Sequence, residues 1–294
     1  MHSLALSGDP ERITAIGNVG DDIDFLGLRV SPDLDTVLYT LAGLLDEERG
    51  WGVRDETYSA LAMADLLGEE TWFTLGDRDI GLHLARARRL AAGEPLSAVM
   101  PTLGARLGVR VRILPATNDR LSTIVLTDDG ELPFQTWFVR RHHEDEVRGV
   151  RFDGAERARP APGVIEAIVA AGAVVIAPSN PFVSIAPILA VPGIREALRD
   201  APGHKVAVSP LVGGRAFRGP LAAMMRTLGY RTDSVGIGRL YADVVDTLVL
   251  DRADAQLVPA VEALGLRAAV CDTVMVDPSR RAAIGRRLLE EVLG

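Results

Sequence analysis

The densest group of chemically capable side chains in this sequence is a set of five aspartates within nineteen residues, between Asn18 and Thr36. An apolar run, Ile13 to Val19, precedes them, which is typical of a buried strand that opens into a loop. Ligands of open α/β sheets gather beyond the carboxyl ends of strands, and hard divalent cations prefer carboxylate oxygens. The stretch is therefore a candidate Mg²⁺ site, although a solvated acidic turn before a helix would have the same spacing. The five residues are Asp21, Asp22, Asp24, Asp33 and Asp35.

The acidic stretch needs a strand before it and a helix after it, and the sequence predicts both. A short helix is expected from His2 to Ser7, followed by the apolar strand. Asp33 stands where a helix N-cap would, after Ser31 and Pro32. Leu34 to Leu45 is then predicted to form a mostly apolar helix.

Strands alternate with helices in the last third of the chain. Apolar strands are predicted at Ala173 to Ala177 and in the segments VAVSPLV, TLVLD and AAVCDTVMV, each followed by a helix-forming segment. Such alternation indicates a parallel sheet with helical crossovers, and continuously apolar strands suit burial on both faces. We therefore predict an α/β fold with a doubly wound, mostly parallel sheet.

The middle of the chain has a different pattern. Residues 46–100 carry amphipathic helical spacing in TYSALAMADLLG, IGLHLARARRLAAG and PLSAVMPTLGARLG. From residue 109 the period shifts toward two, in VRVRILPAT, LSTIVLTDDG and ELPFQTWFVRR, with Asp128-Asp129-Gly130 as a hairpin turn. The charge run Arg140 to Glu146 is predicted to be a solvated strand end. This part is expected to be a helical and β-hairpin insertion.

Composition excludes several classes of protein. The chain has 294 residues and a net charge of −8, which makes a nucleic-acid backbone an unsuitable partner. No apolar run approaches the roughly 20 residues that span a bilayer, and the N-terminus has no signal-peptide pattern. The single cysteine, Cys271, excludes an internal disulfide framework and suits a reducing cytoplasm. We expect a cytoplasmic protein that binds neither nucleic acid nor a membrane.

Eight motifs, taken together, carry a family resemblance. In chain order they are NVGDD, SPDLDT, RGWG, LGDRD, ILPATNDR, FQTWFVR, APSNPFVSI and VSPLVGG. This combination resembles the 2-phospho-L-lactate transferase family, called CofD, which acts in the biosynthesis of the deazaflavin coenzyme F-420. The resemblance covers nearly the whole chain and thins after about residue 230.

The resemblance implies a reaction. Members join the deazariboflavin precursor Fo to a phospholactyl or phosphoenolpyruvyl group carried on a guanosine diphosphate, and they release GMP. A ribityl hydroxyl of Fo attacks phosphorus, and the phosphoanhydride bond to GMP breaks. Chemistry of this kind depends on positioning and charge neutralisation, typically with Mg²⁺ on the phosphate oxygens. The resemblance also suggests a homodimer, and the sequence does not choose between the two donors.

The resemblance also implies roles for the acidic stretch. Asp21 and Asp22 of NVGDD, together with Asp35 of SPDLDT, are the implied Mg²⁺ ligands. Asp35 has an alternative role as a contact to Fo, where a carboxylate can orient a hydroxyl and help to remove its proton. Asp24 matches no motif and is expected to be solvated.

Three further residues are implied to bind substrate. Arg78 of LGDRD would hold Fo or a phosphate oxygen, or would alternatively pair with Asp77 or Asp79. Ser179 and Asn180 lie just past a predicted central strand, where backbone N–H groups and short polar side chains can bind a nucleotide. The alternative for these two residues is ordinary turn chemistry, which Asn-Pro also satisfies.

Glycines carry the last two predictions. Gly213 and Gly214 follow VSPLV and would allow either close approach of the backbone to a ligand or a tight turn. Family members begin with a strand and a glycine-rich loop of the GGxGGAR kind, and here the first motif is already NVGDD. We hypothesise that the sequence starts late and lacks this phosphate-binding loop.

These patterns predict an organisation and a function. Residues 1–45 and 160–294 would form a Rossmann-like nucleotide-binding core, and residues 46–159 would form the inserted subdomain that contributes to the deazaflavin site. The expected function is Mg²⁺-dependent transfer of the phospholactyl or phosphoenolpyruvyl group to Fo. The alternatives are a CofD-like regulatory protein that binds a nucleotide sugar, and an inactive, truncated paralogue.

Overall fold

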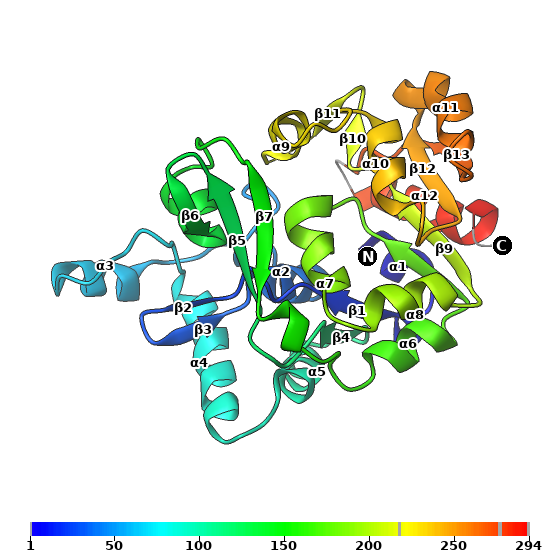
Figure 1. Cartoon of the computed structure of the whole chain (residues 1–294). Helices are drawn as coiled ribbons and strands as arrows, with labels where there is room; N and C mark the ends of the chain where they lie inside the picture. Colours follow the sequence, from blue (N-terminus) through cyan, green and yellow to red (C-terminus); the bar gives the residue numbers. More distant parts are fainter. Residues whose placement is uncertain (1, 217–218, 276–277, 293–294) are drawn as a thin grey trace.

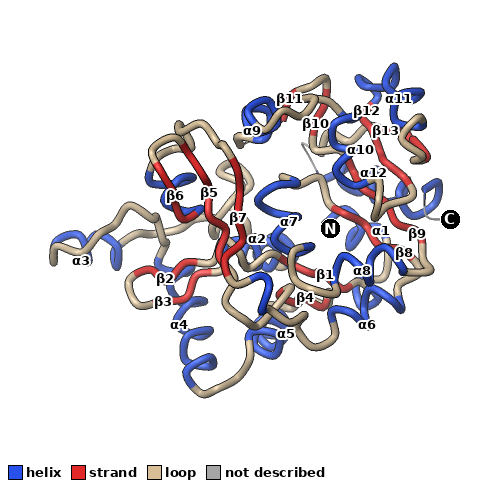
Figure 2. The backbone as a smooth tube through the Cα atoms, in the orientation of Figure 1, coloured by secondary structure: helices blue, strands red, loops and turns tan. Residues whose placement is uncertain are grey.

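The computed structural model describes residues 2–216, 219–275 and 278–292 (Figure 1). Its main sheet has four parallel strands in the order β13-β12-β9-β8. Figure 2 shows these strands side by side in the half of the molecule that holds both termini. The predicted parallel α/β fold is confirmed. The strands are β8 (Ala173–Ile176), β9 (His204–Val208), β12 (Thr247–Asp251) and β13 (Arg267–Cys271).

Helices cover both faces of the main sheet. Alternate residues of a strand point to opposite faces, so Ala207 and Leu248 join the large core, whereas Val208 and Val249 join a second, smaller core. All five residues of β12 are buried, as expected for a strand covered on both sides. The large core includes α6 (Val164–Ala170), α8 (Ile194–Asp200), α10 (Ser234–Tyr241) and α11 (Val258–Glu262), and the smaller core includes α1 (His2–Ser7) and α12 (Pro278–Arg287).

A second parallel ladder carries the acidic stretch. β1 (Thr14–Gly17) pairs with β4 (Arg112–Pro115), so the parallel strands form two ladders where one sheet was predicted. β4 lies within residues 46–159 but pairs with a strand of the predicted core. The division into a core of 1–45 with 160–294 and an insertion of 46–159 remains a prediction.

The middle of the chain forms three helices and an antiparallel sheet, as the sequence predicts. The helices are α3 (Ser59–Leu66), α4 (Asp77–Ala91) and α5 (Leu96–Arg106). The sheet has the order β6-β5-β7, and the predicted turn joins β5 to β6 with Thr127 opposite Gly130. Its strands are β5 (Ser122–Thr127), β6 (Gly130–Pro133) and β7 (Gly149–Asp153).

The segment after β6 was predicted as a strand, and this prediction was wrong. Residues Thr136–Arg140 form a single wide helical turn instead. Phe134, Trp137 and Phe138 are spaced as on one side of a helix, and Trp137 is fully buried among them. The charge run from Arg140 to Glu146 is a turn rather than a strand end.

The start of the helix after the acidic stretch also differs from the prediction. α2 spans Pro32–Leu41, with Ser31 at the N-cap position and Pro32 in the first turn. Proline is favoured there because its missing N–H would have no helical partner. Asp33 therefore lies inside the first turn, where the helix dipole favours its negative charge. Before α2, a short hairpin that was not predicted joins β2 (Ile23–Phe25) and β3 (Leu28–Val30).

Among the described residues, no single helix has the length and apolar content needed to cross a bilayer. Two consecutive helical segments, Pro181–Leu189 and Ile194–Asp200, have that content together but are bent by 88°. Val191, Ile194 and Leu198 are buried in the large core, where they pack with the helices of the main sheet.

Candidate active site

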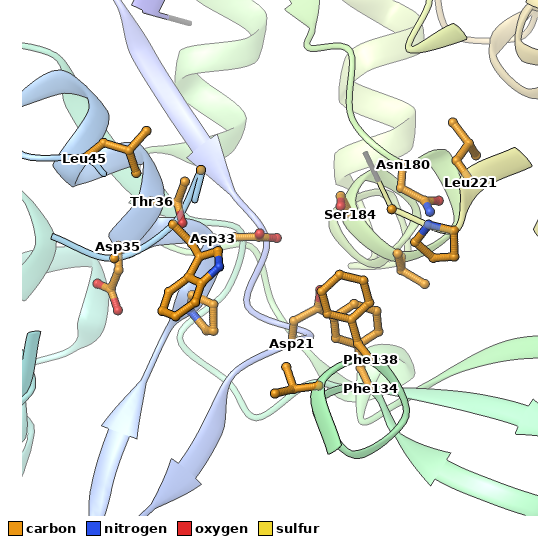
Figure 3. A pocket seen from close by; sticks show the side chains of 18 of the residues that line it. Asp21, Asp33, Asp35, Thr36, Leu45, Phe134, Phe138, Asn180, Ser184 and Leu221 are labelled. Atoms are coloured by element: carbon orange, nitrogen blue, oxygen red, sulfur yellow. The ribbon is translucent and has the colours of Figure 1, made fainter. Parts of the chain in front are cut away.

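A cavity of about 890 Å³ is lined by residues from distant parts of the chain (Figure 3). The acidic stretch supplies one part of the wall. Loops at the carboxyl ends of the parallel strands supply another, because Pro178 and Asn180 follow β8, Ser209 follows β9, and Thr273 follows β13. These strand ends are where ligands bind in open α/β sheets.

Asp21 and Asp33 line the cavity from two different elements. Asp21 lies in the loop after β1, and Asp33 lies in the first turn of α2. Asn18 joins the two elements, because its Nδ2 donates to Asp33 Oδ2 at 2.9 Å and to the carbonyl oxygen of Val183 at 3.2 Å. Its Oδ1 accepts from the N–H of Gly20 at 2.7 Å. The buried amide of Asn18 therefore fixes the loop against the helix.

Burial raises the pKa of both carboxyl groups. The pKa of Asp21 lies well above its usual range, first because of burial and then because of the charge on Asp33. Burial likewise raises the pKa of Asp33, and the hydrogen bond from Asn18 opposes this effect. Within the described residues neither carboxylate has a salt-bridge partner, and Asp21 Oδ1 has no hydrogen bond. A divalent cation between these two groups would remove their repulsion.

The protein alone does not complete a metal site. In the described part of the chain, no group of three or more His, Cys, Asp or Glu side chains is arranged to hold a metal ion. Mg²⁺ is commonly held by one or two carboxylates, with water and substrate phosphates as the other ligands. Asp21 and Asp33 fit this arrangement.

The other two predicted metal ligands have protein partners. Asp22 accepts a hydrogen bond from the hydroxyl of Ser31 at 2.8 Å and lies 3.6 Å from Arg29. Asp35 pairs with both terminal nitrogens of Arg86 and accepts from the backbone N–H of Ser31 at 3.2 Å. Asp22 and Asp35 are therefore each paired with an arginine, unlike Asp21 and Asp33, and only Asp35 of the two lines the cavity. Asp22 Oδ1 is nevertheless buried without a hydrogen bond, like Asp21 Oδ1.

A buried polar network lies behind Asp35. His83 of α4 is fully buried, with Nδ1 3.8 Å from Asp35 Oδ2 and Nε2 3.2 Å from Asp79 Oδ1. The hydroxyl of Tyr39 in α2 donates to the same oxygen of Asp79. These contacts, with the Asp35–Arg86 pair, join α2 to α4, and Asp79 and His83 also line the cavity.

Arg78 is exposed and lies outside the cavity lining. Its Nη1 donates to the carbonyl oxygen of Arg54 at 3.0 Å, and the structure shows no ion pair with Asp77 or Asp79. Asp77 instead accepts from the backbone N–H of Ala60 at 2.9 Å, at the start of α3. The alternative of an internal ion pair in LGDRD is therefore not found among the described residues, and the binding of Fo or a phosphate oxygen by Arg78 stays a prediction.

Of the predicted nucleotide-binding residues, only Asn180 lines the cavity. Asn180 lines the cavity, and its Oδ1 accepts from the N–H of Phe182 at 2.9 Å, which closes the turn that starts the next helical segment. Ser179 is adjacent but outside the lining. Gly213 and Gly214 have φ values of 58° and 73° and form the turn between β10 (Leu211–Val212) and β11 (Arg215–Ala216). These values require glycine for the turn itself.

Sequence reasoning missed the phenylalanine side chains of the wall. Phe134 and Phe138 line the cavity and stack on each other with ring centroids 5.2 Å apart. Phe73 and Trp51 line it as well, and Trp51 remains 45% exposed. The four-residue spacing of Phe134 and Phe138 would have indicated a shared face if FQTWFVR had been treated as helical. Flat apolar walls of this kind suit a planar ring system.

Comparisons with known proteins agree with this architecture. The 2-phospho-L-lactate transferase CofD family matches residues 3–292. A phosphoenolpyruvate transferase of Streptomyces griseus is 44% identical over 284 residues, covering 95% of this chain and 89% of that protein. One of Thermobifida fusca is 44% identical over 291 residues, covering 97% and 88%. A solved UPF0052 family structure from Bacillus halodurans has a TM-score of 0.61 at 19% identity, with 98% of this chain and 95% of that chain covered, which shows a shared fold alone.

Proposed function

Because the chain belongs to the 2-phospho-L-lactate transferase (CofD) family, as its motifs predict, we propose that it transfers a phosphoenolpyruvyl group from a guanosine diphosphate-linked donor to Fo and releases GMP, in coenzyme F-420 biosynthesis. The choice of the enolpyruvyl donor over the lactyl donor rests on the relatives named phosphoenolpyruvate transferases. The observation that carries the proposal is one cavity whose wall has an acidic pair, Asp21 and Asp33, and a group of aromatic rings.

The two parts of the cavity would bind the two substrates. Asp21 and Asp33 would hold Mg²⁺, which supplies positive charge to the phosphate oxygens of the donor when it is bound. Phe134 and Phe138 would hold the flat deazaflavin ring and exclude water. The ribityl hydroxyl oxygen then forms a bond to phosphorus, the phosphoanhydride bond breaks, and its oxygen leaves with GMP.

Asp35 has the position of an orienting group rather than a base. Its carboxylate is held by the two terminal nitrogens of Arg86, so both carboxylate oxygens already have a partner. A hydrogen bond from the substrate hydroxyl to Asp35 would still fix the direction of attack. The hydroxyl proton would pass to water at the open side of the cavity.

Incubation of the purified protein with Fo, Mg²⁺ and each guanylylated donor tests the proposal. We expect GMP release and a product of the mass of Fo plus the phosphoenolpyruvyl group, with slower turnover of the phospholactyl donor. A titration with a UDP-sugar is the matched control for the regulatory alternative. Binding of the UDP-sugar without any GMP release from either donor would overturn the proposed reaction.

A further inference from the structure

One arginine lines the cavity among the described residues, and neither the motifs nor the family resemblance points to it. Arg281 lies in α12, near the end of the chain. No other lysine or arginine of the described residues lines this cavity. The same wall carries five carboxylates, which are Asp21, Asp33, Asp35, Glu47 and Asp79.

Arg281 is paired with a residue 234 positions away in the chain. Its Nη1 and Nη2 donate to the two carboxylate oxygens of Glu47, at 2.8 and 3.1 Å. The arginine side chain is 17% exposed, whereas the Glu47 side chain is 53% exposed. The Nε of Arg281 lies 3.4 Å from the carbonyl oxygen of Met275. The guanidinium is therefore mostly buried in the protein, and the more exposed carboxylate of Glu47 contacts it from the solvent side.

The geometry of this pair is that of an anion site. A guanidinium offers two parallel N–H groups that fit a carboxylate or a phosphate equally well. Exposed ion pairs contribute little to stability, so a ligand with more negative charge can replace Glu47. Arg281 also lowers the pKa of Glu47, which keeps that carboxylate charged and bound to it in the free protein.

A donor with several negative charges needs such a partner in an acidic cavity. Asp35 is neutralised by Arg86, and Asp79 accepts from Tyr39, so these two carboxylates are already satisfied. His2 lies beside the Glu47–Arg281 pair, where burial and the charge of Arg281 lower its pKa and keep it neutral. Arg281 is thus the permanent positive charge of the described cavity wall.

We propose that Arg281 binds an oxyanion of the donor, either a phosphate of the nucleoside diphosphate or the carboxylate of the transferred acid, and that Glu47 occupies this site in the free protein. The inference rests on the proposed function for the identity of the ligand. It assigns a binding role to a residue of α12, outside the motifs of the acidic stretch.

Calorimetric titration with GDP and, separately, with phosphoenolpyruvate tests this role, in the presence of Mg²⁺. We expect Arg281→Gln to weaken binding of at least one probe by about tenfold or more, the range for a hydrogen-bonded charge. Loss with GDP assigns the site to the diphosphate, and loss with phosphoenolpyruvate alone assigns it to the acid end. Unchanged binding of both probes overturns the proposal.

Glu47→Gln should change ligand affinity in the opposite direction, which distinguishes a ligand-binding role of Arg281 from a purely structural ion pair. Removal of the competing carboxylate frees the guanidinium, so affinity should rise by roughly two- to fivefold. If Glu47→Gln weakens binding as much as Arg281→Gln does, the pair only closes the fold and the proposal fails. Arg281→Lys keeps the charge without the fork, and we expect intermediate affinity from it.

The matched control is the bidentate surface pair Arg195–Asp243, with distances of 2.9 and 2.6 Å, outside the cavity lining. Arg195→Gln should leave both affinities unchanged. The melting temperature of each variant shows that it is folded. Because these titrations need neither Fo nor turnover, a protein that binds GDP through Arg281 but never releases GMP overturns the proposed reaction and leaves this inference standing.

Discussion

The guanidinium of Arg86 holds the carboxylate of Asp35 inside the protein, while the neighbouring Asp33 faces the open cavity. The Arg86 side chain is fully buried and donates to both carboxylate oxygens, and its Nη1 also donates to the carbonyl oxygen of Arg29. Figure 3 shows the Asp33 and Asp35 side chains pointing in different directions. Two aspartates of one motif therefore have different surroundings, since Asp35 is paired with an arginine and Asp33 has no cation partner among the described residues.

Loss of Arg86 should be costly because it leaves Asp35 buried without a cation. We expect Arg86→Gln to lower the free energy of unfolding by about 3–5 kcal/mol, measured by urea denaturation at pH 7.5. Arg195→Gln, which breaks an exposed pair with Asp243, should cost no more than about 1 kcal/mol. Equal losses of unfolding free energy in the two variants would show that the Asp35–Arg86 pair contributes no more to stability than an exposed ion pair does.

The charged carboxylates of Asp21 and Asp33 should lower the stability of the folded protein at neutral pH when no cation is bound. Burial raises both pKa values, so the folded protein loses stability as pH rises above the unfolded value of about 4. Asp33→Asn removes this penalty and should be more stable than the parent chain at pH 7.5 without divalent cations. The two proteins should converge near pH 4, where the parent carboxyl group is protonated.

The same carboxylates should respond to Mg²⁺. The melting temperature of the parent chain should rise with Mg²⁺ concentration, because binding to the folded state alone stabilises it. Asp21→Asn and Asp33→Asn should lose this rise, whereas Asp24→Asn should keep it, since Asp24 is exposed and pairs with Arg29 at 3.1 Å. If the melting temperature of Asp21→Asn and of Asp33→Asn still rises with Mg²⁺, the cation binds elsewhere.

Much of this fold follows from local patterns. The apolar strands around Val206 and Val249 were predictable because burial on both faces leaves a continuous apolar run. The place of Asp21 in the cavity wall was predictable because an apolar strand ends just before it. FQTWFVR was not, because a short apolar run fits both a strand and a helical turn.

The partners of the acidic residues depend on tertiary contacts that no local pattern encodes. Arg86 stands beside Arg88 and Arg89 in the run ARARR, and nothing in their spacing shows that only the first is fully buried. Arg281 and Glu47 are separated by 234 positions, so their contact appears only when α12 packs near the cavity. Such pairings are set by the fold as a whole.

The aromatic wall should be specific for the planar substrate. We expect Phe138→Ala to raise the KM for Fo by about tenfold, since a base-sized ring loses one stacking surface. Binding of GDP should stay within twofold, because Arg281, its proposed partner, belongs to a different element, α12. Fluorescence titration with Fo and calorimetry with GDP measure the two effects. Equal losses for both ligands would indicate collapse of the helical turn Thr136–Arg140 instead.

Asp251, the last residue of β12, gives a pH prediction because it binds Thr273, a residue of the cavity wall that follows β13. Burial acts to raise its pKa, but hydrogen bonds from the N–H groups of Ala253 and Thr273, at 2.9 and 2.8 Å, outweigh this and lower it. A lowered folded pKa gives stability that is present above the unfolded value of about 4 and lost as pH falls through the folded value.

Asp251→Asn should therefore cost about 1–3 kcal/mol at pH 7, because the replacement accepts fewer and weaker hydrogen bonds. The difference from the parent chain should shrink as pH falls from 4 toward 2.5, where the parent carboxylate becomes protonated. Urea denaturation at pH 7, 4 and 3 measures this dependence. Asp246→Asn, which changes an exposed residue before the same strand, is the matched control and should show little effect at pH 7. A cost for Asp251→Asn that is independent of pH would mean that packing of the loop, and not the charge on Asp251, holds Thr273 in place.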